Sequence, residues 1–179
     1  WKPFPEPESE EWKESLKGYF ASITAVDMNV GRIFEKLKDQ GIADNTLVMF
    51  SSDNGPEVPT VISMRHDHKH DGARPWRGVK RDNWEGGHRV PFIARWPGKI
   101  PAASQSEEPI VHVDMFPTFM ELAGVRKIDQ PLDGVSILPV LRDPSRMLKR
   151  DAIYWHFPGY LQSYIPDRVW RTTPVSTIR

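Results

Sequence analysis

The stretch Thr46–Pro56, TLVMFSSDNGP, decides the fold that we expect for this chain. Its first half, Thr46–Phe50, is a continuous apolar run that is too short for a helix and follows the turn pair Asp44-Asn45. A strand that is apolar on both faces is typical of the middle of a sheet covered by helices. The second half places polar side chains directly after that strand. The stretch therefore predicts an α/β sheet with a candidate site at the carboxyl end of one strand.

A helix is predicted upstream of this strand, because apolar residues recur there at steps of three and four. They are Ile23, Val26, Val30, Ile33 and Leu37. Gly41 supplies the expected end of the helix. Further strands are expected at Val90–Trp96 and Ile153–Phe157, and a short helix is expected between Asp114 and Gly124. A helix, a tight loop and a buried strand together form half of an α/β unit.

The composition excludes several classes of protein. The 179 residues carry 24 Lys and Arg against 24 Asp and Glu, and this zero net charge argues against a polybasic nucleic-acid or membrane-surface binder. No apolar run reaches the length of about 18 residues that a membrane-spanning helix needs. Cysteine is absent, which excludes disulfides and a cysteine nucleophile within these residues.

The first candidate site is the SSDNGP segment that follows the predicted strand. Asp53 and Asn54 offer a carboxylate and an amide oxygen, which are hard ligands suited to Ca²⁺ or Mg²⁺. The pair Gly55-Pro56 turns the chain sharply, so that both side chains can point to one place. From the spacing alone, a plain Asx turn remains the better interpretation of these residues.

The second candidate site is the segment Trp76–Pro91, WRGVKRDNWEGGHRVP. It gathers basic groups, acidic groups and a double glycine just before a predicted strand. Lys80 on this glycine-bounded loop can reach an anion as a compact point charge. A solvated basic loop is the alternative interpretation, and it is the simpler one when the segment is taken by itself.

Two segments that contain histidine are weaker candidates. His66–Asp71 (HDHKHD) offers imidazole and carboxylate groups of the kind that bind Zn²⁺. No strand or helix is predicted to fix these side chains, so a surface loop is favoured over a zinc site. His156 lies among aromatic residues near the end of the chain, where a histidine is more typically a packing residue.

Taken in order, the motifs of this chain resemble the sulfatase family, the formylglycine-dependent sulfuric ester hydrolases of the alkaline phosphatase superfamily. The resemblance runs from about Tyr19 to Arg179. It rests on LVMFSSDNGP at 47–56, RGVK at 77–80, EGGHRVPFIARWPG at 85–98, HVDMFPTFMELAG at 112–124, LDGVSILPVL at 132–141 and YWHFP at 154–158. The ordered set is much more specific than the DNG tripeptide alone.

The resemblance implies an α/β fold with a central mixed sheet flanked by helices, alkaline phosphatase-like and incomplete in this chain. Residues 1–14, which are rich in Pro and Glu, are predicted to form an extended arm. Residues 15–145 then correspond to the C-terminal part of the catalytic domain. Residues 146–179 correspond to the start of a small, truncated C-terminal subdomain.

The resemblance also implies roles for particular residues. Asp53 and Asn54 match calcium ligands, with Mg²⁺ as the alternative ion, and Lys80 matches the residue that contacts the sulfate and the leaving oxygen. His156 is a further candidate for substrate contact. The implied substrate is a sulfated sugar or an aryl sulfate, with no nucleic-acid partner and no membrane span. The family suggests a periplasmic, secreted or lysosomal-type compartment, and the oligomeric state is left open.

The chain departs from the family in one decisive respect. The family's nucleophile lies in a Cys/Ser-x-Pro-x-Arg motif whose Cys or Ser becomes formylglycine, and this motif does not occur in the 179 residues. We therefore expect the nucleophile outside this chain, and no sulfatase activity from the chain alone. Around Lys80 the family usually has small residues, whereas this sequence has Val79 and Arg81. Two alternatives stay open: a phosphodiester or phosphonate hydrolase of the same superfamily, and a non-catalytic binding module derived from a sulfatase.

Overall fold

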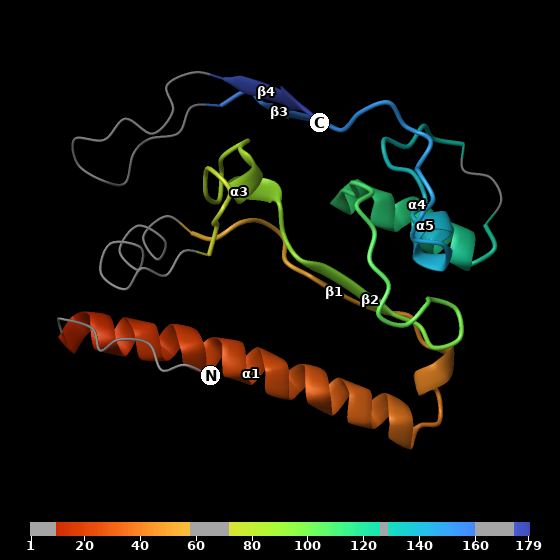
Figure 1. The fold of residues 1–179 in the computed structure, drawn as a ribbon, viewed down its shortest axis with the longest axis horizontal. Coiled ribbons are helices and arrows are strands. Elements are labelled where there is room, and N and C mark those ends of the chain that lie inside the picture. Colours follow the sequence, from red (N-terminus) through yellow and green to blue (C-terminus); the bar gives the residue numbers. More distant parts are fainter. Residues whose placement is uncertain (1–9, 58–71, 126–128, 160–173) are drawn as a thin grey trace. The chain divides into compact units, whose positions relative to one another are not determined.

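The computed structural model of the chain describes residues 10–57, 72–125, 129–159 and 174–179 (Figure 1). The chain divides into two compact units. The first unit comprises Trp1–Thr46 with Asn54–Val90, and the second comprises Leu47–Asp53 with Pro91–Arg179. In the described ranges, no helix is both long enough and apolar enough to cross a membrane.

The first unit contains the helix α1, Glu10–Asp39, drawn as the long ribbon in Figure 1. Gly41 follows it with a φ of 66°, a conformation that glycine adopts without steric cost, so the helix ends where the sequence predicts. The short 3₁₀ helix η1, Ala43–Asn45, comes next. The helix begins earlier than its apolar stripe suggests. Residues 10–14 of the predicted extended arm are helical, and residues 1–9 lie outside the described ranges.

The apolar stripe of α1 is exposed in this structure. Ile23, Val26 and Ile33 keep 46%, 51% and 55% of their surface accessible to solvent. The sequence predicts that this stripe packs against a sheet; such packing would join the first unit to the second, and it stays a prediction. Periodicity determines which residues share one face of a helix. Whether that face is buried depends on an element packing onto it.

The second unit contains the antiparallel strands β1, Val48–Ser51, and β2, Phe92–Arg95. Val48 pairs with Arg95, and Ser51 pairs with Phe92. The Ser51 hydroxyl also donates a hydrogen bond of 3.0 Å to the Pro91 carbonyl, which ties the two strands together at the carboxyl end of β1. The strands predicted at Thr46–Phe50 and Val90–Trp96 are thus confirmed, with small shifts at their ends.

The sheet is smaller than the central mixed sheet that the sequence suggests. Within the described ranges, each of the two sheets has two antiparallel strands. Phe50 on β1 keeps 44% of its surface exposed, because β1 is not enclosed on both faces here. An apolar strand predicts a buried position, but the number of neighbouring strands is set by other segments of a fold.

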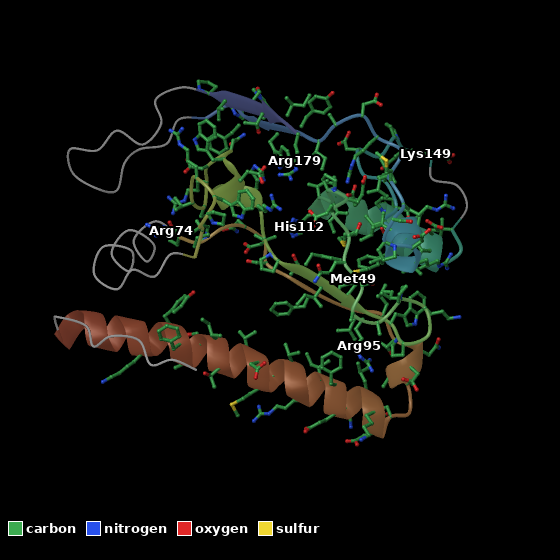
Figure 2. All side chains as sticks on the ribbon, viewed as in Figure 1. Met49, Arg74, Arg95, His112, Lys149 and Arg179 are labelled. Carbon is green, nitrogen blue, oxygen red and sulfur yellow. The ribbon has the colours of Figure 1, made fainter. Side chains whose placement is uncertain are left out.

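One face of β1 and β2 packs on the core of the second unit. This core is centred on Ile137 and on two residues of the helix α5, Leu138–Arg142. Met49 of β1, labelled in Figure 2, and Met115, at the start of the helix α4, Met115–Leu122, pack against it. The buried members of the cluster are Ile137, Val140, Leu141 and Leu148. Burial of such side chains is worth about 1.5–3 kcal/mol each, and this burial fixes β1 on α5.

Asp114, the residue before α4, is fully buried and joins three segments of the second unit. Its carboxylate accepts hydrogen bonds from the backbone N–H groups of Val111 (2.8 Å) and Val135 (3.0 Å) and from the Arg150 guanidinium (2.8 Å). Its backbone carbonyl accepts a bond of 2.6 Å from the hydroxyl of Thr118. The sequence predicts only that Asp114 opens a helix.

The strands β3, Tyr154–Phe157, and β4, Val175–Ile178, form a second antiparallel pair. The first of them confirms the strand predicted at Ile153–Phe157, whereas sequence reasoning did not find β4. The residues after 145 belong to the same compact unit as residues 91–145, so the division by contacts does not fall at 145. The assignment of residues 146–179 to a separate C-terminal subdomain stays a prediction.

Candidate functional site

Lys80 lies at the tip of a tight turn formed by residues 79–82. The backbone N–H of Asp82 donates to the Val79 carbonyl at 2.9 Å, and the Asp82 carboxylate accepts the Val79 N–H at 3.1 Å. Arg81, the third residue of the turn, has a φ of 76°. A positive φ at this position is typical of a type II turn, which normally places glycine there. The turn exposes Lys80 and Arg81 side by side.

Backbone hydrogen bonds fasten this turn to the segment that follows Asp53 and Asn54. The Lys80 N–H donates to the Pro56 carbonyl at 2.8 Å. The Gly55 N–H donates to the Gly87 carbonyl, also at 2.8 Å. The turn that carries Lys80 therefore lies against the DNGP segment, although more than twenty residues separate the two in sequence.

The double glycine before β2 makes this close approach possible. It lies in the short helix α3, Glu85–His88, and both of its members are buried. A Cβ atom on Gly86 would lie 2.2 Å from the Gly78 carbonyl oxygen, and one on Gly55 would lie 1.9 Å from the Gly86 carbonyl oxygen. No side chain fits at such distances, so these glycines are required by packing of backbone on backbone.

Three charged side chains gather beside the turn. One terminal nitrogen of the Arg81 guanidinium lies 2.8 Å and 2.9 Å from the two carboxylate oxygens of Glu57. The Lys80 ammonium lies 3.5 Å from Glu57 Oε2. The Lys80, Glu57 and Arg81 side chains keep 41%, 35% and 30% of their surface accessible, so solvent and small ions can reach them. We call these three residues the Glu57 cluster.

Two cation–π pairs brace the same loop. The Arg77 guanidinium lies over the Trp84 ring at 4.3 Å, and that of Arg89 lies over the Trp76 ring at 3.9 Å. Exposed pairs of this kind contribute about 0.5–1 kcal/mol each. Because each pair joins the segment before Lys80 to the segment after it, they hold the two ends of the Lys80 loop together.

The predicted metal ligands come just before Gly55 and Pro56, the residues that are hydrogen-bonded to this loop. Asp53 is exposed and Asn54 is half-buried. One residue, Ser52, lies between them and the end of β1. Their oxygens suit a hard cation, but two ligands are fewer than the about 6–8 oxygens that Ca²⁺ takes. Across the described ranges, no group of three or more His, Asp or Glu gathers as ligands. The donor chemistry of the pair suits calcium, and further ligands of such an ion would have to come from outside the described residues.

Of the two histidine candidates, His156 lies within the described residues. His156 lies on β3, where its Nδ1 is 2.8 Å from the hydroxyl of Ser176, its cross-strand partner on β4. It belongs to the second unit and its role in substrate contact stays a prediction. The candidate zinc segment His66–Asp71 lies outside the described ranges.

Sequence reasoning missed Glu57 and the part that Arg81 plays with it. No periodic pattern connects a carboxylate at position 57 with cations at positions 80 and 81. One signal was present, because Arg81 and Val79 replace the small residues usual beside this lysine in the sulfatase family. An unusual residue at a turn position that favours glycine is a reason to look for a partner of its side chain.

The Lys80 turn is hydrogen-bonded to Pro56, two residues after Asn54. A lysine together with a carboxylate and an amide suits a hydrolase of anionic esters, because such groups stabilise charge on sulfuryl or phosphoryl oxygens, directly or through a bound cation. Residues 2–125 match the sulfatase family model, and residues 76–177 match the model of the C-terminal part of N-sulphoglucosamine sulphohydrolase. The first match covers more than half of the chain. The chain therefore belongs to the sulfatase family.

Individual proteins agree with this assignment. The chain is 33% identical to the steryl-sulfatase of Rattus norvegicus over 168 residues, which are 92% of this chain and 28% of that protein. A structure solved in complex with its substrate, D-glucosamine-2-N,6-O-disulfate, has a TM-score of 0.66 and 31% identity over 90% of this chain and 29% of that chain. The phosphonate monoester hydrolase of Agrobacterium radiobacter has a TM-score of 0.58 and 31% identity, covering 82% of this chain and 26% of that chain.

These similarities confirm the predicted fold class as an incomplete α/β fold of the alkaline phosphatase type. The chain spans less than a third of the length of the proteins named above. The antiparallel pairs β1–β2 and β3–β4, the helices α1, α4 and α5 and the glycine-rich Lys80 loop are among the parts of this fold that the described residues supply.

Proposed function

We propose that the complete protein that carries these residues hydrolyses sulfate esters, and that this chain supplies Lys80 and the Asp53-Asn54 pair to its active site. One observation carries the proposal. The Lys80 N–H is hydrogen-bonded to the Pro56 carbonyl, so the lysine turn lies on the segment that directly follows the two candidate metal ligands. This hydrogen bond supports the proposal that the two motifs act in the same site.

Lys80 would act on the charge that develops during hydrolysis. When a sulfate ester is attacked at sulfur, negative charge grows on the sulfuryl oxygens and on the leaving oxygen. An ammonium group that is already in place stabilises that charge without the cost of reorganising solvent. The backbone bonds of residues 79–82 preorganise Lys80 for this role.

Asp53 and Asn54 would hold a Ca²⁺ ion, with Mg²⁺ as the alternative. Such an ion, when bound, supplies Lewis-acid polarisation of the sulfate oxygens. Asp53 contributes a charge and Asn54 a neutral oxygen, so the pair binds the ion without cancelling its charge. The nucleophile, expected to be formylglycine, and the other metal ligands belong to residues outside this chain.

Sulfate esters of sugars or aryl alcohols are the substrate class that we infer. One similar structure contains a sulfated glucosamine as its substrate, and another similar protein is a steryl-sulfatase. Both sugar and non-sugar leaving groups therefore occur among similar proteins. A phosphonate or phosphodiester hydrolase is the second candidate, because a phosphonate monoester hydrolase is among the similar structures. The same cation and lysine would serve either ester.

The test compares sulfate and phosphonate esters with the complete protein. We expect 4-nitrophenyl sulfate or glucosamine 6-sulfate to be turned over faster than phenyl phosphonate esters. Lys80→Ala should lower kcat by roughly 10²–10³, as is typical for the loss of one charge-stabilising donor. Lys99→Ala removes an exposed lysine near β2 and is the matched control.

Three outcomes would contradict the proposal. Preference for the phosphonate esters would favour the second candidate. Absence of any turnover, with retained binding of sulfated sugars, would favour a non-catalytic binding module. Turnover by the 179-residue chain alone would show that the nucleophile lies within it, contrary to the role given to residues outside the chain.

A further inference from the structure

The Glu57 cluster is asymmetric in a way that the proposed function does not require. The contacts between Glu57 and Arg81, at 2.8 Å and 2.9 Å, have the length of charge-assisted hydrogen bonds. The contact between Glu57 and Lys80, at 3.5 Å, is clearly longer. One carboxylate thus serves two cations and holds one of them tightly and the other loosely.

The backbone conformation fixes the positions of Glu57, Lys80 and Arg81 relative to one another. Glu57 directly follows Pro56, whose carbonyl accepts the Lys80 N–H, so the carboxylate is placed beside the turn. Arg81 reaches it from a backbone φ of 76°, which is uncommon for a residue other than glycine. Unfavourable backbone conformations of this kind persist where the surrounding contacts enforce them, and they concentrate at functional sites.

We propose that Glu57 is a positioning residue for Lys80. Arg81 anchors the Glu57 carboxylate, and the carboxylate orients the Lys80 ammonium. When the sulfate ester binds, the ammonium exchanges its contact with Glu57 for a hydrogen bond to an oxygen of the ester. This inference rests on the proposed function and names a residue that acts through Lys80. Lys80 has three N–H donors, and Glu57 occupies at most one of them, so donors remain for the substrate.

Charge explains why both partners are needed. The two cations and one carboxylate carry a net charge of one positive unit, which attracts a sulfate monoester of one negative unit. If Glu57 faced Lys80 without Arg81, the carboxylate would compete with the substrate for the ammonium. If Glu57 were absent, the flexible lysine stem would sample many rotamers, and less of the population would be ready for the transition state.

A purely structural role makes a different prediction. The cluster joins residue 57 to residues 80 and 81, and a partly exposed ion pair that only braces the loop would contribute little to stability. Loss of such an ion pair would change kcat and KM only because the loop becomes less rigid. A positioning role instead predicts that kcat and KM change independently. The orientation of Lys80 affects kcat, whereas the local charge affects substrate binding and therefore KM.

The first experiment measures kcat and KM of the complete protein with one sulfate ester. We expect Glu57→Gln to lower kcat by between about tenfold and about a hundredfold, the range expected when a catalytic group is misplaced, with KM unchanged or lower. Arg81→Gln should raise KM, because Glu57, once it has lost Arg81, competes with the substrate for the Lys80 ammonium. Glu85→Gln is the matched control, since it removes the same charge from the Glu85–Arg89 pair of 3.2 Å in the same loop.

Inorganic sulfate provides a readout that does not depend on activity, because a ligand of the folded state raises the melting temperature more, at a given concentration, the more tightly it binds. The rise with sulfate should be larger in Glu57→Gln than in the unchanged protein, smaller in Arg81→Gln and lost in Lys80→Ala. Equal rises in all four proteins, or kinetic constants of Glu57→Gln that match those of Glu85→Gln, would overturn the inference. If no sulfate ester is turned over but the melting temperatures follow the expected order, the proposed activity fails while the pairing of Glu57 with Lys80 stands.

Discussion

Two ion-pair clusters among the described residues share the same chemistry and differ in burial. In the second unit, Asp114 is fully buried and its Arg150 partner keeps only 13% of its side-chain surface accessible. In the first unit, the side chains of the Glu57 cluster keep roughly a third or more of theirs. A buried charge must be fully paired because its desolvation is costly. A partly exposed charge can exchange its partner for a substrate at little cost.

The partners of the two clusters differ accordingly. Arg150 donates to the Asp114 carboxylate and to the Pro109 carbonyl, and two backbone N–H groups occupy the remaining positions around Asp114. The Asp114 carboxylate thus accepts three hydrogen bonds and is shielded from solvent. Lys80, in contrast, has a single long contact with Glu57 among the ion pairs of the described residues. Burial therefore separates a structural ion pair from a candidate functional one.

The largest expected effect breaks the buried cluster. Asp114→Ala leaves the Arg150 charge and two backbone N–H groups without their acceptor, and we expect a loss of about 3–5 kcal/mol in the free energy of unfolding. Urea denaturation measures this loss. Glu121→Ala removes an exposed carboxylate from the same helix and should stay within about 0.5 kcal/mol. A small effect of Asp114→Ala would show that the cluster does not hold the second unit together.

The next effect concerns the backbone that presents Lys80. Gly86→Ala places a Cβ atom 2.2 Å from the Gly78 carbonyl oxygen, so the loop must shift, at a cost of about 1–3 kcal/mol. Thermal unfolding measures the cost, and kcat with a sulfate ester should fall because Lys80 moves.

Gly31→Ala is the matched control for this change. Gly31 lies in α1 with nothing within 4 Å of the added atom, and alanine should stabilise the helix by up to about 1 kcal/mol. If Gly86→Ala changed the stability by as little as Gly31→Ala, the backbone around the Lys80 loop would not be as closely packed as the structure shows.

A smaller effect tests the exposed cluster directly. Glu57→Gln should change the free energy of unfolding by no more than about 1 kcal/mol, because the ion pairs that it removes are partly exposed. Chemical denaturation of this variant beside Asp114→Asn gives the comparison, since both changes replace a carboxylate by an amide. Losses of equal size would remove the distinction between the two clusters.

The smallest effect depends on pH and lies at an exposed turn after α5. Two hydrogen bonds from Ser145, one from its hydroxyl at 2.6 Å and one from its backbone N–H at 3.1 Å, hold the pKa of the Asp143 carboxyl below its ordinary value, with a further contribution from Arg146. A lowered pKa in the folded state means that the stabilisation is present above the ordinary pKa of aspartate. It is lost as the pH falls through the lower, folded-state value.

The amide resonance of Ser145, followed by NMR during an acid titration, measures this pKa. We expect a midpoint below about 3.9, the ordinary value for aspartate. Ser145→Ala removes the hydroxyl donor and should raise the midpoint toward that value. A midpoint that does not respond to this substitution would assign the shift to another cause.

Local patterns in the sequence were enough to find most of the regular elements. The steps of three and four between Ile23 and Leu37 identified α1, and a positive φ at Gly41 confirmed its end. Apolar runs located β1, β2 and β3 within a few residues. These predictions succeeded because hydrogen bonding and side-chain direction repeat over short distances along the chain. The ordered motifs also identified the sulfatase family, which the comparisons confirm.

Long-range contacts were beyond the reach of the sequence. Glu57 meets Arg81 across 24 positions, and Asp114 meets Val135 and Arg150 across 21 and 36 positions. No local period connects such residues, since the path of the intervening chain decides whether they meet.

By itself, the sequence determined the elements, the family and the residue types available for chemistry: the carboxylate and amide at Asp53 and Asn54, and the ammonium at Lys80. Only the tertiary structure decided that the Lys80 turn lies on Pro56 and that Arg81 and Lys80 share the carboxylate of Glu57. It also decided that Asp114 is a buried junction rather than a simple helix start. Residue types follow from the chain directly, whereas distance and burial, which set the strength of every charge interaction, arise only when distant segments pack together.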